Sequence, residues 1–400
     1  MKVNFFNAKN GDAIHLETDA EKNIFIDMGY SKTYSNYIKE QIIKIADDNQ
    51  NINLLIISHI DQDHIGGALH FLQDIKNNEF DKKIICEIWH NSYRHLNLPK
   101  VKNIGPVDYR VLEELREKFE AENRKEYISV GDKEISAMQG STLAVLIYKL
   151  GIPWNEIFDG KPVLGNSKVS FDGLNITILT PNLKTIEKLK CFWRNELLRS
   201  KYDFQFGEDE LFDDAYEFYL LNEEVIENNF NKNISSDRVE KFKELLESGV
   251  NIEVPGDESI TNASSISLII EADGKRVLFT ADATDDDLYN SLTSLSDKGV
   301  SMGFDLIKLS HHGAVKNNMK WLSAVKAKYY VISTDSSKHN HPDIGFIVNI
   351  INNNKDHKTI CFNNYIKTID EISNPSIMEA YNYSIMLPNQ DWGVEIELKE

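Results

Sequence analysis

The sequence predicts an α/β core into which two long, charged helical segments are inserted. Short apolar runs bounded by turn residues, which are typical of strands, gather toward the two ends of the chain. The segments 93–166 and 183–258 are instead mostly charged, with a helical pattern. Polar residues follow directly after several of the apolar runs, as they do at the edge of an α/β sheet. We therefore expect one domain over residues 1–400, with 93–166 and 183–258 forming a helical cap.

The N-terminal part reads as strands followed by helices. Apolar or alternating runs at 3–6, 13–16 and 23–26 predict strands, with a turn at Gly11-Asp12. Isoleucines recur at helical spacing over 37–46, and the continuous apolar run 52–57 is typical of a buried strand. We expect Gly66-Gly67 to open another helix, with Leu69, Leu72 and Ile75 on one face.

The later strands are expected mainly as hairpins. The runs 168–171 and 174–179 are joined through Asp172-Gly173, and the runs 266–270 and 275–279 through Asp273-Gly274. Two more apolar runs, 304–309 and 329–332, complete the predicted strands.

Composition and charge exclude several classes of protein. A hydrophobic content of 41% excludes a wholly disordered chain. The net charge of −19 excludes a protein that coats nucleic acid without specificity, because phosphate neutralisation needs surplus Lys and Arg. No window approaches about 18 apolar residues, and the three cysteines form no CxxC. We expect a reduced, cytoplasmic protein with no membrane association.

The strongest chemical signal lies directly after the predicted strand 52–57. Four potential metal ligands, His59, Asp61, Asp63 and His64, fall within 59–64. Imidazole and carboxylate are natural ligands of divalent metals. The alternative is a polar loop in which Asp63 caps a helix, but a cap requires neither two histidines nor a second aspartate. We expect a tight loop that aims His59 and Asp61 at one ion and the other pair at a second.

Three further strands end in residues of the same kind. Asp282 follows the run 275–281, His311-His312 follows 304–309, and His341 lies in the loop after 329–333. Each residue alone is an ordinary turn, cap or loop residue. Together with the first motif they predict one site, because ligands gather at the carboxyl ends of sheet strands. Adjacent residues rarely face one ion together, so we assign His311 to the metal and expect His312 to point away from it, toward substrate.

These motifs resemble the metallo-β-lactamase fold. The segment 59–64 is similar to its HxHxDH signature, with aspartate in place of the second histidine, and Gly11-Asp12, 26–29, 280–282 and 310–313 match further landmarks in order. The subgroup most resembled is the metallo-β-lactamase-like domain of the competence-type DNA-uptake membrane protein, which shares the Asn-x-x-Ser at 262–265 and His341-Pro342. The resemblance covers about 1–90, 166–182 and 259–360, and it implies an αββα sandwich.

The resemblance also implies a ligand set. His59 and Asp61 would bind metal one, Asp282 would bridge the two ions, and metal two would take Asp63, His64 and His311. The ions would be Zn²⁺ or Mn²⁺, with Fe²⁺ or Mg²⁺ as alternatives, because site one is rich in oxygen ligands.

The resemblance has departures, and it also implies roles beyond the ligand set. The third histidine of metal one is absent, with Asn262 near its place, and Ala281 replaces the usual glycine. Asp63 and His341 are the expected catalytic residues, with His341 donating a proton to the leaving group or gripping a phosphate oxygen. Asp27 is a candidate for orienting the histidines.

The charge pattern near these residues favours an anionic substrate. Residues 308–328 contain five lysines and no acidic residue, so we expect positive charge beside the metals, with Lys316, Lys320, Asn262 and His312 contacting substrate. The segment 184–201 interleaves basic residues with Phe192 and Trp193, as single-strand binding surfaces do. The alternative is an amphipathic helix with these rings in the core. The block 202–230 has ten acidic residues and no Lys or Arg, so the cap is dipolar.

The sequence is compatible with three functions. The first is a metal-dependent phosphodiesterase or nuclease acting on DNA. We expect it to serve as an effector in bacterial or antiviral defence, with a separately encoded protein partner. The second is hydrolysis of a small ester, thioester or lactam. The third is an interaction protein that keeps the fold without turnover.

Overall fold

The strands form two sheets in this computed structural model, which describes residues 1–92, 95, 143–189, 191, 238–249, 255–338 and 341–399. Across the first sheet the order is β14 (Gly393–Glu397), β1 (Lys2–Phe6), β2 (Ala13–Glu17), β3 (Asn23–Met28), β4 (Ile52–Ile56) and β5 (Ile88–Trp89). Across the second it is β13 (Tyr383–Met386), β12 (Lys358–Phe362), β11 (Lys326–Ile332), β10 (Gly303–Lys308), β9 (Lys275–Phe279), β8 (Ser267–Ala272), β7 (Leu174–Thr180) and β6 (Ser167–Phe171).

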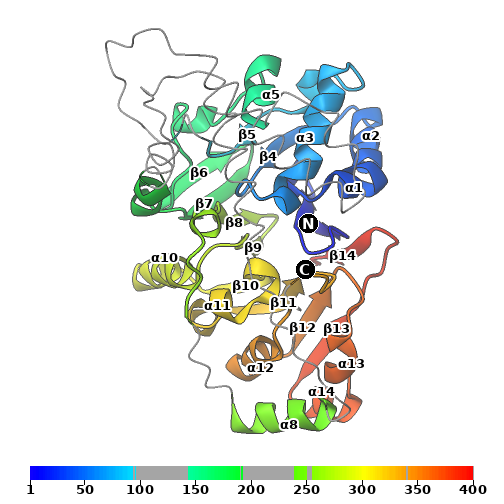
Figure 1. The fold of residues 1–400 in the computed structure, drawn as a ribbon, viewed down its shortest axis with the longest axis vertical. Helices are drawn as coiled ribbons and strands as arrows, with labels where there is room; N and C mark the ends of the chain where they lie inside the picture. The colour runs from blue at the N-terminus through cyan, green and yellow to red at the C-terminus, as the bar shows by residue number, and fades with distance from the viewer. Residues whose placement is uncertain are drawn as a thin grey trace, which may run out of the picture.

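Helices cover the outer face of each sheet (Figure 1). The first sheet carries α1 (Ser31–Thr33), a π-helical turn (Tyr34–Ile38), α2 (Lys39–Asp47), α3 (Gln62–Lys76) and α5 (Leu143–Leu150). The second carries α8 (Arg238–Ser248), α10 (Asp285–Asp297), α12 (Ile344–Asn353) and α13 (Thr368–Ile372). A third apolar cluster, with Leu54 from one sheet and Leu306 from the other, fills the space between the sheets. The expected αββα sandwich is confirmed. None of the helices in the described ranges is long and apolar enough to span a bilayer.

The predicted strands are all present, but the sequence did not reveal β5, β12, β13 and β14. β14 pairs with β1, and Leu398 N–H donates to Met1 O at 2.9 Å, so the two ends of the chain lie side by side (Figure 1). The hydrophobic pattern of a strand shows which of its side chains are buried, but it does not show which distant strand pairs with it. The pairing of β14 with β1 was therefore not predictable from either segment alone.

The helix after β4 begins earlier than its glycines suggested. α3 starts at Gln62, so Asp61 is its N-cap, and Asp63 and His64 lie in its first turn instead of in a loop. Gly67 instead permits close packing: its N–H donates to Gly29 O at 2.7 Å, and a Cβ on it would lie 2.1 Å from Met28 O. The glycine thus brings the start of α3 against the end of β3.

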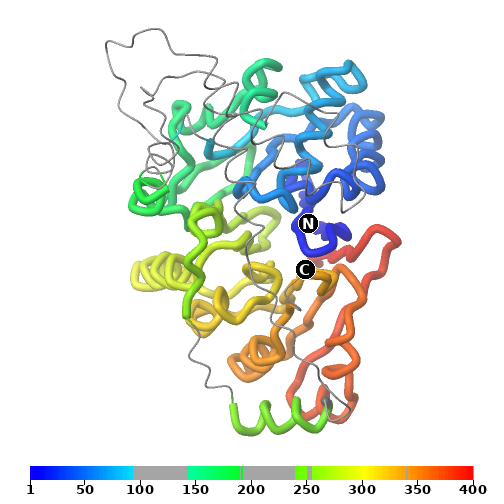
Figure 2. Tube along the Cα trace, viewed as in Figure 1, coloured from blue at the N-terminus to red at the C-terminus, as the bar shows by residue number. Residues whose placement is uncertain are grey.

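The described parts of the two helical segments are divided between the two helical layers: α5 and residues 183–189 pack with the first sheet, whereas α8 lies at the other end of the molecule (Figure 2). α5 packs against α3 in the core under the first sheet, whereas Phe242 and Leu246 of α8 pack against α12 and α13. Most of 93–142, 192–237 and 250–254, with Phe192 and Trp193, falls outside the described residues. The single domain with a helical cap stays a prediction.

Candidate metal centre

The candidate residues gather where parallel strands of both sheets end. Ser58 and His59 follow β4, Asp282 follows β9, and His311 and His312 follow β10. β9, β10 and β11 are neighbouring parallel strands, so their carboxyl ends share one edge. This is the edge at which the sequence predicted a site.

His59 and His64 are each held by a partner on Nδ1. His59 Nδ1 lies 2.9 Å from Ser58 Oγ, and His64 Nδ1 lies 2.8 Å from Asp27 Oδ2, the residue expected to orient a histidine. Asp27 also accepts hydrogen bonds from the backbone N–H and the hydroxyl of Ser58, at 2.8 and 2.6 Å. Within the described part of the chain, both Nε2 atoms are buried and make no hydrogen bond. This is how metal-binding histidines are usually oriented.

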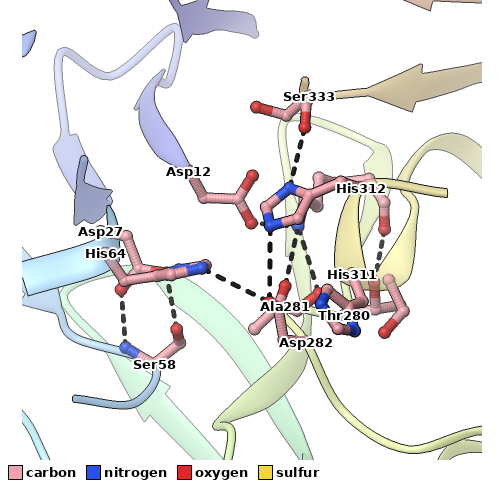
Figure 3. A network of polar contacts seen from close by, with 12 residues as sticks. Asp12, Asp27, Ser58, His64, Thr280, Ala281, Asp282, His311, His312 and Ser333 are labelled. Carbon is pink, nitrogen blue, oxygen red and sulfur yellow. Dashed lines mark hydrogen bonds and ion pairs between the residues drawn. The ribbon is translucent and has the colours of Figure 1, made fainter. Parts of the chain in front are cut away.

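Asp282 lies at the centre of the imidazoles (Figure 3). Its Oδ2 is 3.5 Å from His64 Nε2, 3.6 Å from His312 Nε2 and 4.0 Å from His59 Nε2. The preceding Ala281 has φ +47°, the left-handed region that favours glycine, which accounts for the glycine usual at this landmark. The central position of Asp282 fits a bridging ligand.

Asp61 and Asp63 also face the cluster. Asp61 makes no capping hydrogen bond with its side chain, although it is the N-cap of α3, and its Oδ2 lies 3.1 Å from His59 Nε2. Asp63 Oδ1 lies 4.0 Å from His64 Nε2, and its Oδ2 accepts a hydrogen bond from Asn10 Nδ2 at 2.8 Å. The geometry therefore favours the ligand interpretation over the helix cap.

Both histidines of the 310–313 motif face Asp282, so the expectation that His312 points away is wrong. His312 Nδ1 donates to Ser333 O at 2.9 Å, which turns Nε2 toward Asp282 (Figure 3). Ligand atoms of Asp63, His64 and His312 lie within 4.8 Å of one another. His311 and His312 have φ +42° and +57°, and two successive left-handed residues turn the chain so that both rings face inward. Such backbone strain clusters at functional sites.

His311 has its Nδ1 engaged by a group that the sequence did not reveal. Nδ1 lies 3.1 Å from Asn317 Oδ1 and 3.4 Å from both Asp257 Oδ2 and Asn262 Nδ2. Asp257 also accepts hydrogen bonds from Asn262 Nδ2 at 2.7 Å and Asn317 Nδ2 at 2.9 Å. No pattern in the sequence distinguishes Asp257 from an ordinary turn residue after glycine.

The late His-Pro motif reaches the same place. The rings of His341 and His311 are 5.8 Å apart between centroids. A Cβ on Gly313, whose φ is +86°, would lie 2.7 Å from Pro342 Cβ, so this glycine allows the two motifs to pack together. His341 and Asn262 therefore both lie beside His311, where contact with substrate was expected.

A buried lysine completes the centre. Lys308 Nζ forms an ion pair with Asp12, donates to Ala281 O at 3.1 Å and lies 3.8 Å from Asp282 Oδ1. Burial raises the pKa of Asp12, and although burial opposes it, the charges of Asp12 and Asp282 raise the pKa of Lys308. In the sequence, Asp12 stands out only as part of the Gly11-Asp12 turn, and Lys308 only as one of five lysines in 308–328.

The expected basic stretch does not present five unneutralised charges. Besides Lys308, four lysines of 308–328 each pair with a carboxylate: Lys316 with Asp257, Lys320 with Asp286, Lys326 with Asp356 and Lys328 with Asp305. Lys326 and Lys328 lie in the first half of β11, away from its carboxyl end. Of the two lysines assigned to substrate, only Lys316 lies near His311, through Asp257.

Without metal, His59 and Asp282 already take the protonation states that ligands need, whereas His64 would have to release a proton to bind a metal. Burial, reinforced by His64, lowers the pKa of His59 to about 4. Burial would raise the pKa of Asp282, but His312 and His64 hold it well below its usual range. Burial would also lower the pKa of His64, but Asp282 and Asp27 raise it well above its usual value. His59 is therefore neutral and Asp282 ionised near neutral pH, as metal coordination requires.

The donor set fits divalent cations. Among the residues that the structure describes, four groups of three have ligand atoms within 4.8 Å of one another: His59, His64 and Asp282; Asp63, His64 and His312; Asp282, His311 and His312; and Asp12, Asp27 and His64. Imidazole nitrogen and carboxylate oxygen suit Zn²⁺, Mn²⁺ and Fe²⁺. Within the described ranges, the buried Nε2 atoms of His59 and His64 have no hydrogen-bond partner. A bound cation would give each of them one.

Comparison with known proteins agrees with this fold. Residues 9–141 match the family model of the Metallo-beta-lactamase superfamily, a range that includes Gly11-Asp12 and 59–64 and ends before Asp282. With the αββα sandwich, this gives the chain a metallo-β-lactamase-like fold. No curated protein matches the sequence.

Two solved structures are similar at low identity. Zn(2+)-bound PqqB from Methylobacterium extorquens is 11% identical, with 97% of this chain and 87% of that chain covered and a TM-score of 0.34. A long form RNase Z from yeast is 10% identical, with a TM-score of 0.37; all of this chain but half of that chain is covered (100% and 50%).

Proposed function

We propose that this protein is a metal-dependent phosphodiesterase that cleaves nucleic acid, with DNA as the preferred substrate. One observation carries the proposal: Asp282 Oδ2 lies within 4.0 Å of the Nε2 atoms of three buried histidines. Each of those histidines has its other nitrogen held by Ser58, Asp27 or Ser333. Such an arrangement suits two divalent ions bridged by a carboxylate.

The ligand set follows the sequence prediction with one change. His59 and Asp61 would hold metal one, and Asp282 would bridge. Metal two would take Asp63, His64 and His312, since these three have ligand atoms within 4.8 Å of one another. Two bound divalent ions would supply an activated water and stabilise charge developing on the substrate.

The protein's own residues would orient the reaction. Ser58, Asp27 and Ser333 fix the imidazole rings, so the donors need no rearrangement when substrate arrives. His341, whose ring is 5.8 Å from that of His311, would donate a proton to the leaving oxygen.

Three features support a phosphodiester over a small neutral ester. The ligand set contains three aspartates, so with two divalent ions the centre is net positive. The 15-residue helix α3 begins at the centre, and a helix N-terminus favours an anion. The 59–64 motif and the 262–265 pattern are similar to those of the competence-type DNA-uptake domain. Hydrolysis of an ester, thioester or lactam, and an interaction protein without turnover, are the alternatives.

The test combines metal analysis with hydrolysis assays. Wild type, His64→Ala and Asp282→Ala are compared with the control His357→Ala, an exposed histidine bonded to Ser384 beside β12. Each is loaded with Mn²⁺ or Zn²⁺ and incubated with single- and double-stranded DNA, RNA, cyclic nucleotides, a small ester and a lactam. We expect wild type and the control to bind metal and cleave DNA, and the two site variants to lose both.

Each contrary outcome identifies a different error. Site variants that keep metal and activity would show that the ligand assignment is wrong. Metal-loaded wild type that cleaves only the ester or lactam would favour the second function. Metal-loaded wild type that cleaves nothing would favour the interaction protein.

We further propose that the enzyme serves as a regulated effector in bacterial defence, released by a separately encoded partner. Support comes from the two long segments inserted between the metal-ligand motifs, 93–166 and 183–258, and from the net charge of −19. Constitutive full activity of the isolated protein on DNA would contradict this control.

A further inference from the structure

Two lysines from distant parts of the chain meet at one aromatic ring near the metal centre. Lys9 Nζ lies 5.8 Å from the centroid of the Tyr30 ring, and Lys338 Nζ lies 6.0 Å from the same centroid. Lys9 is in the loop between β1 and β2, Tyr30 lies between β3 and α1, and Lys338 follows β11 of the other sheet. No motif or spacing in the sequence associates these three residues.

The positive charges of this group are not neutralised. Both lysines are exposed, and neither forms an ion pair with a carboxylate in the part of the chain that the structure describes. They differ in this from the lysines of 308–328, each of which pairs with an acid. The face of an aromatic ring attracts ammonium groups, so Tyr30 favours two like charges close together.

The loops that carry the lysines are fixed to each other. Ser333 Oγ, at the end of β11, donates to Gly11 O at 2.8 Å. Asn364 Nδ2 donates to Lys9 O at 3.5 Å, and Asn363 Nδ2 donates to Phe6 O at 2.8 Å. These bonds join the two sheets at the edge that carries the metal centre, so the two ammonium groups are presented together by the fold.

A short chain of hydrogen bonds connects the group to a metal ligand. Tyr30 Oη donates to Asn10 Oδ1 at 3.0 Å, and Asn10 Nδ2 donates to Asp63 Oδ2 at 2.8 Å. The Tyr30 hydroxyl is therefore two hydrogen bonds from Asp63. The lysines consequently border the centre on the side of Asp63.

We propose that Lys9, Tyr30 and Lys338 form a subsite for a backbone phosphate of a nucleic acid strand that extends beyond the scissile phosphodiester. The inference rests on the proposed phosphodiesterase function. Phosphates repeat along a strand, so an enzyme that cleaves one can bind a neighbouring one, and lysine ammonium groups are suited to this contact. The subsite requires an extended substrate, which a small phosphodiester does not provide.

The test uses the full-length chain with Lys9→Gln/Lys338→Gln. Lys326→Gln is the matched control. Lys326, at the start of β11, is also exposed, but it forms an ion pair with Asp356. With Mn²⁺, the double variant should raise KM for a single-stranded oligonucleotide roughly tenfold. It should leave kcat/KM for bis(4-nitrophenyl) phosphate unchanged, and the control should alter neither.

Binding without turnover separates the two proposals. Fluorescence anisotropy in EDTA measures affinity for labelled DNA and RNA strands over a range of salt concentrations. Each lysine lost should reduce the slope of log K against log salt by about 0.7. The strand whose affinity falls, DNA or RNA, identifies the ligand. A wild type that binds strands but cleaves no phosphodiester would contradict the proposed function and keep the subsite.

Two results would overturn the subsite. One is a double variant that binds both strands as wild type does, with the same salt slope. The other is a wild type that binds neither strand.

Discussion

Lys308 and Asp12 form a buried ion pair that joins the two sheets beside the metal centre. Their side chains are 0% and 1% exposed, with Lys308 at the end of β10 and Asp12 just before β2. The lysine also lies 3.8 Å from Asp282 Oδ1, so one ammonium group balances two carboxylates. The pair holds together the two halves of the ligand set.

Replacing Lys308 by methionine should destabilise the protein strongly. Lys308→Met would leave the Asp12 carboxyl buried without its partner, and breaking a buried pair in this way typically costs about 3–5 kcal/mol. Urea unfolding should show the loss, and Asp12→Asn/Lys308→Met should recover part of it. Lys326→Met, which breaks an exposed pair with Asp356, is the control and should cost no more than about 1 kcal/mol. A Lys308→Met chain as stable as wild type would show that the pair contributes nothing.

Asp257 should control the protonation of His311 in the metal-free protein. Burial would lower the pKa of His311, but Asp282 and Asp257 raise it to about 9. The stabilisation from the protonated ring is complete below the unfolded pKa and is lost as pH rises through about 9. Asp257→Asn should lower this pKa, measured by NMR titration, whereas Asp305→Asn, which breaks a pair with Lys328 on the same sheet, should leave it unchanged. Equal titration curves for both variants would exclude the role of Asp257.

His15 should make stability depend on pH in acid. Burial lowers the pKa of His15 to about 4, although the hydrogen bond between its Nε2 and Asn23 Oδ1, at 2.9 Å, opposes this shift. A lowered pKa means that the unfolded chain binds the proton first, so stability falls as pH drops from about 6.5 toward 4. Between pH 7 and 5 the loss from this residue should be roughly 2 kcal/mol. His15→Gln should flatten that part of the pH profile in urea unfolding, and an unchanged slope would refute the assignment.

Gly67 should be intolerant of any side chain. A Cβ there would lie 2.1 Å from Met28 O, so Gly67→Ala must push α3 away from β3. Such overpacking should cost roughly 1–3 kcal/mol, although alanine is the better helix former. Gly303→Ala is the control, since its nearest neighbour would be Ser301 Oγ at 3.6 Å. Thermal unfolding should separate the two variants; if Gly67→Ala melts with wild type, the close packing of α3 is wrong.

Part of the candidate centre could be read from local sequence. His59, Asp61, Asp63 and His64 lie in one short segment, and the strand before them was evident from its isoleucines. The orientation of the adjacent side chains His311 and His312 was not predictable in the same way. His312 faces Asp282 because of two left-handed residues and a bond to Ser333, and neither leaves a signature in residue type.

The sequence also did not show which lysines are neutralised by acidic partners. The lysines of 308–328 looked like one basic surface, yet their acidic partners come from distant segments, including Asp12, Asp257 and Asp356. The unpaired lysines in the described structure that border the centre, Lys9 and Lys338, are 329 positions apart by their numbers and could not be associated by composition.

The sequence by itself determined many of the strands and helices and the kinds of residue at the ends of β4, β9 and β10, because period and turn chemistry are local properties. The sandwich itself was implied by the resemblance of the motifs to a known family. Only the tertiary structure decided which of those residues meet. The pairing of β14 with β1, the ion pair of Lys308 with Asp12 and the contact of Asp257 with His311 each join distant segments. Such contacts form when both sheets bury their apolar faces together, which depends on the whole chain and not on any single segment.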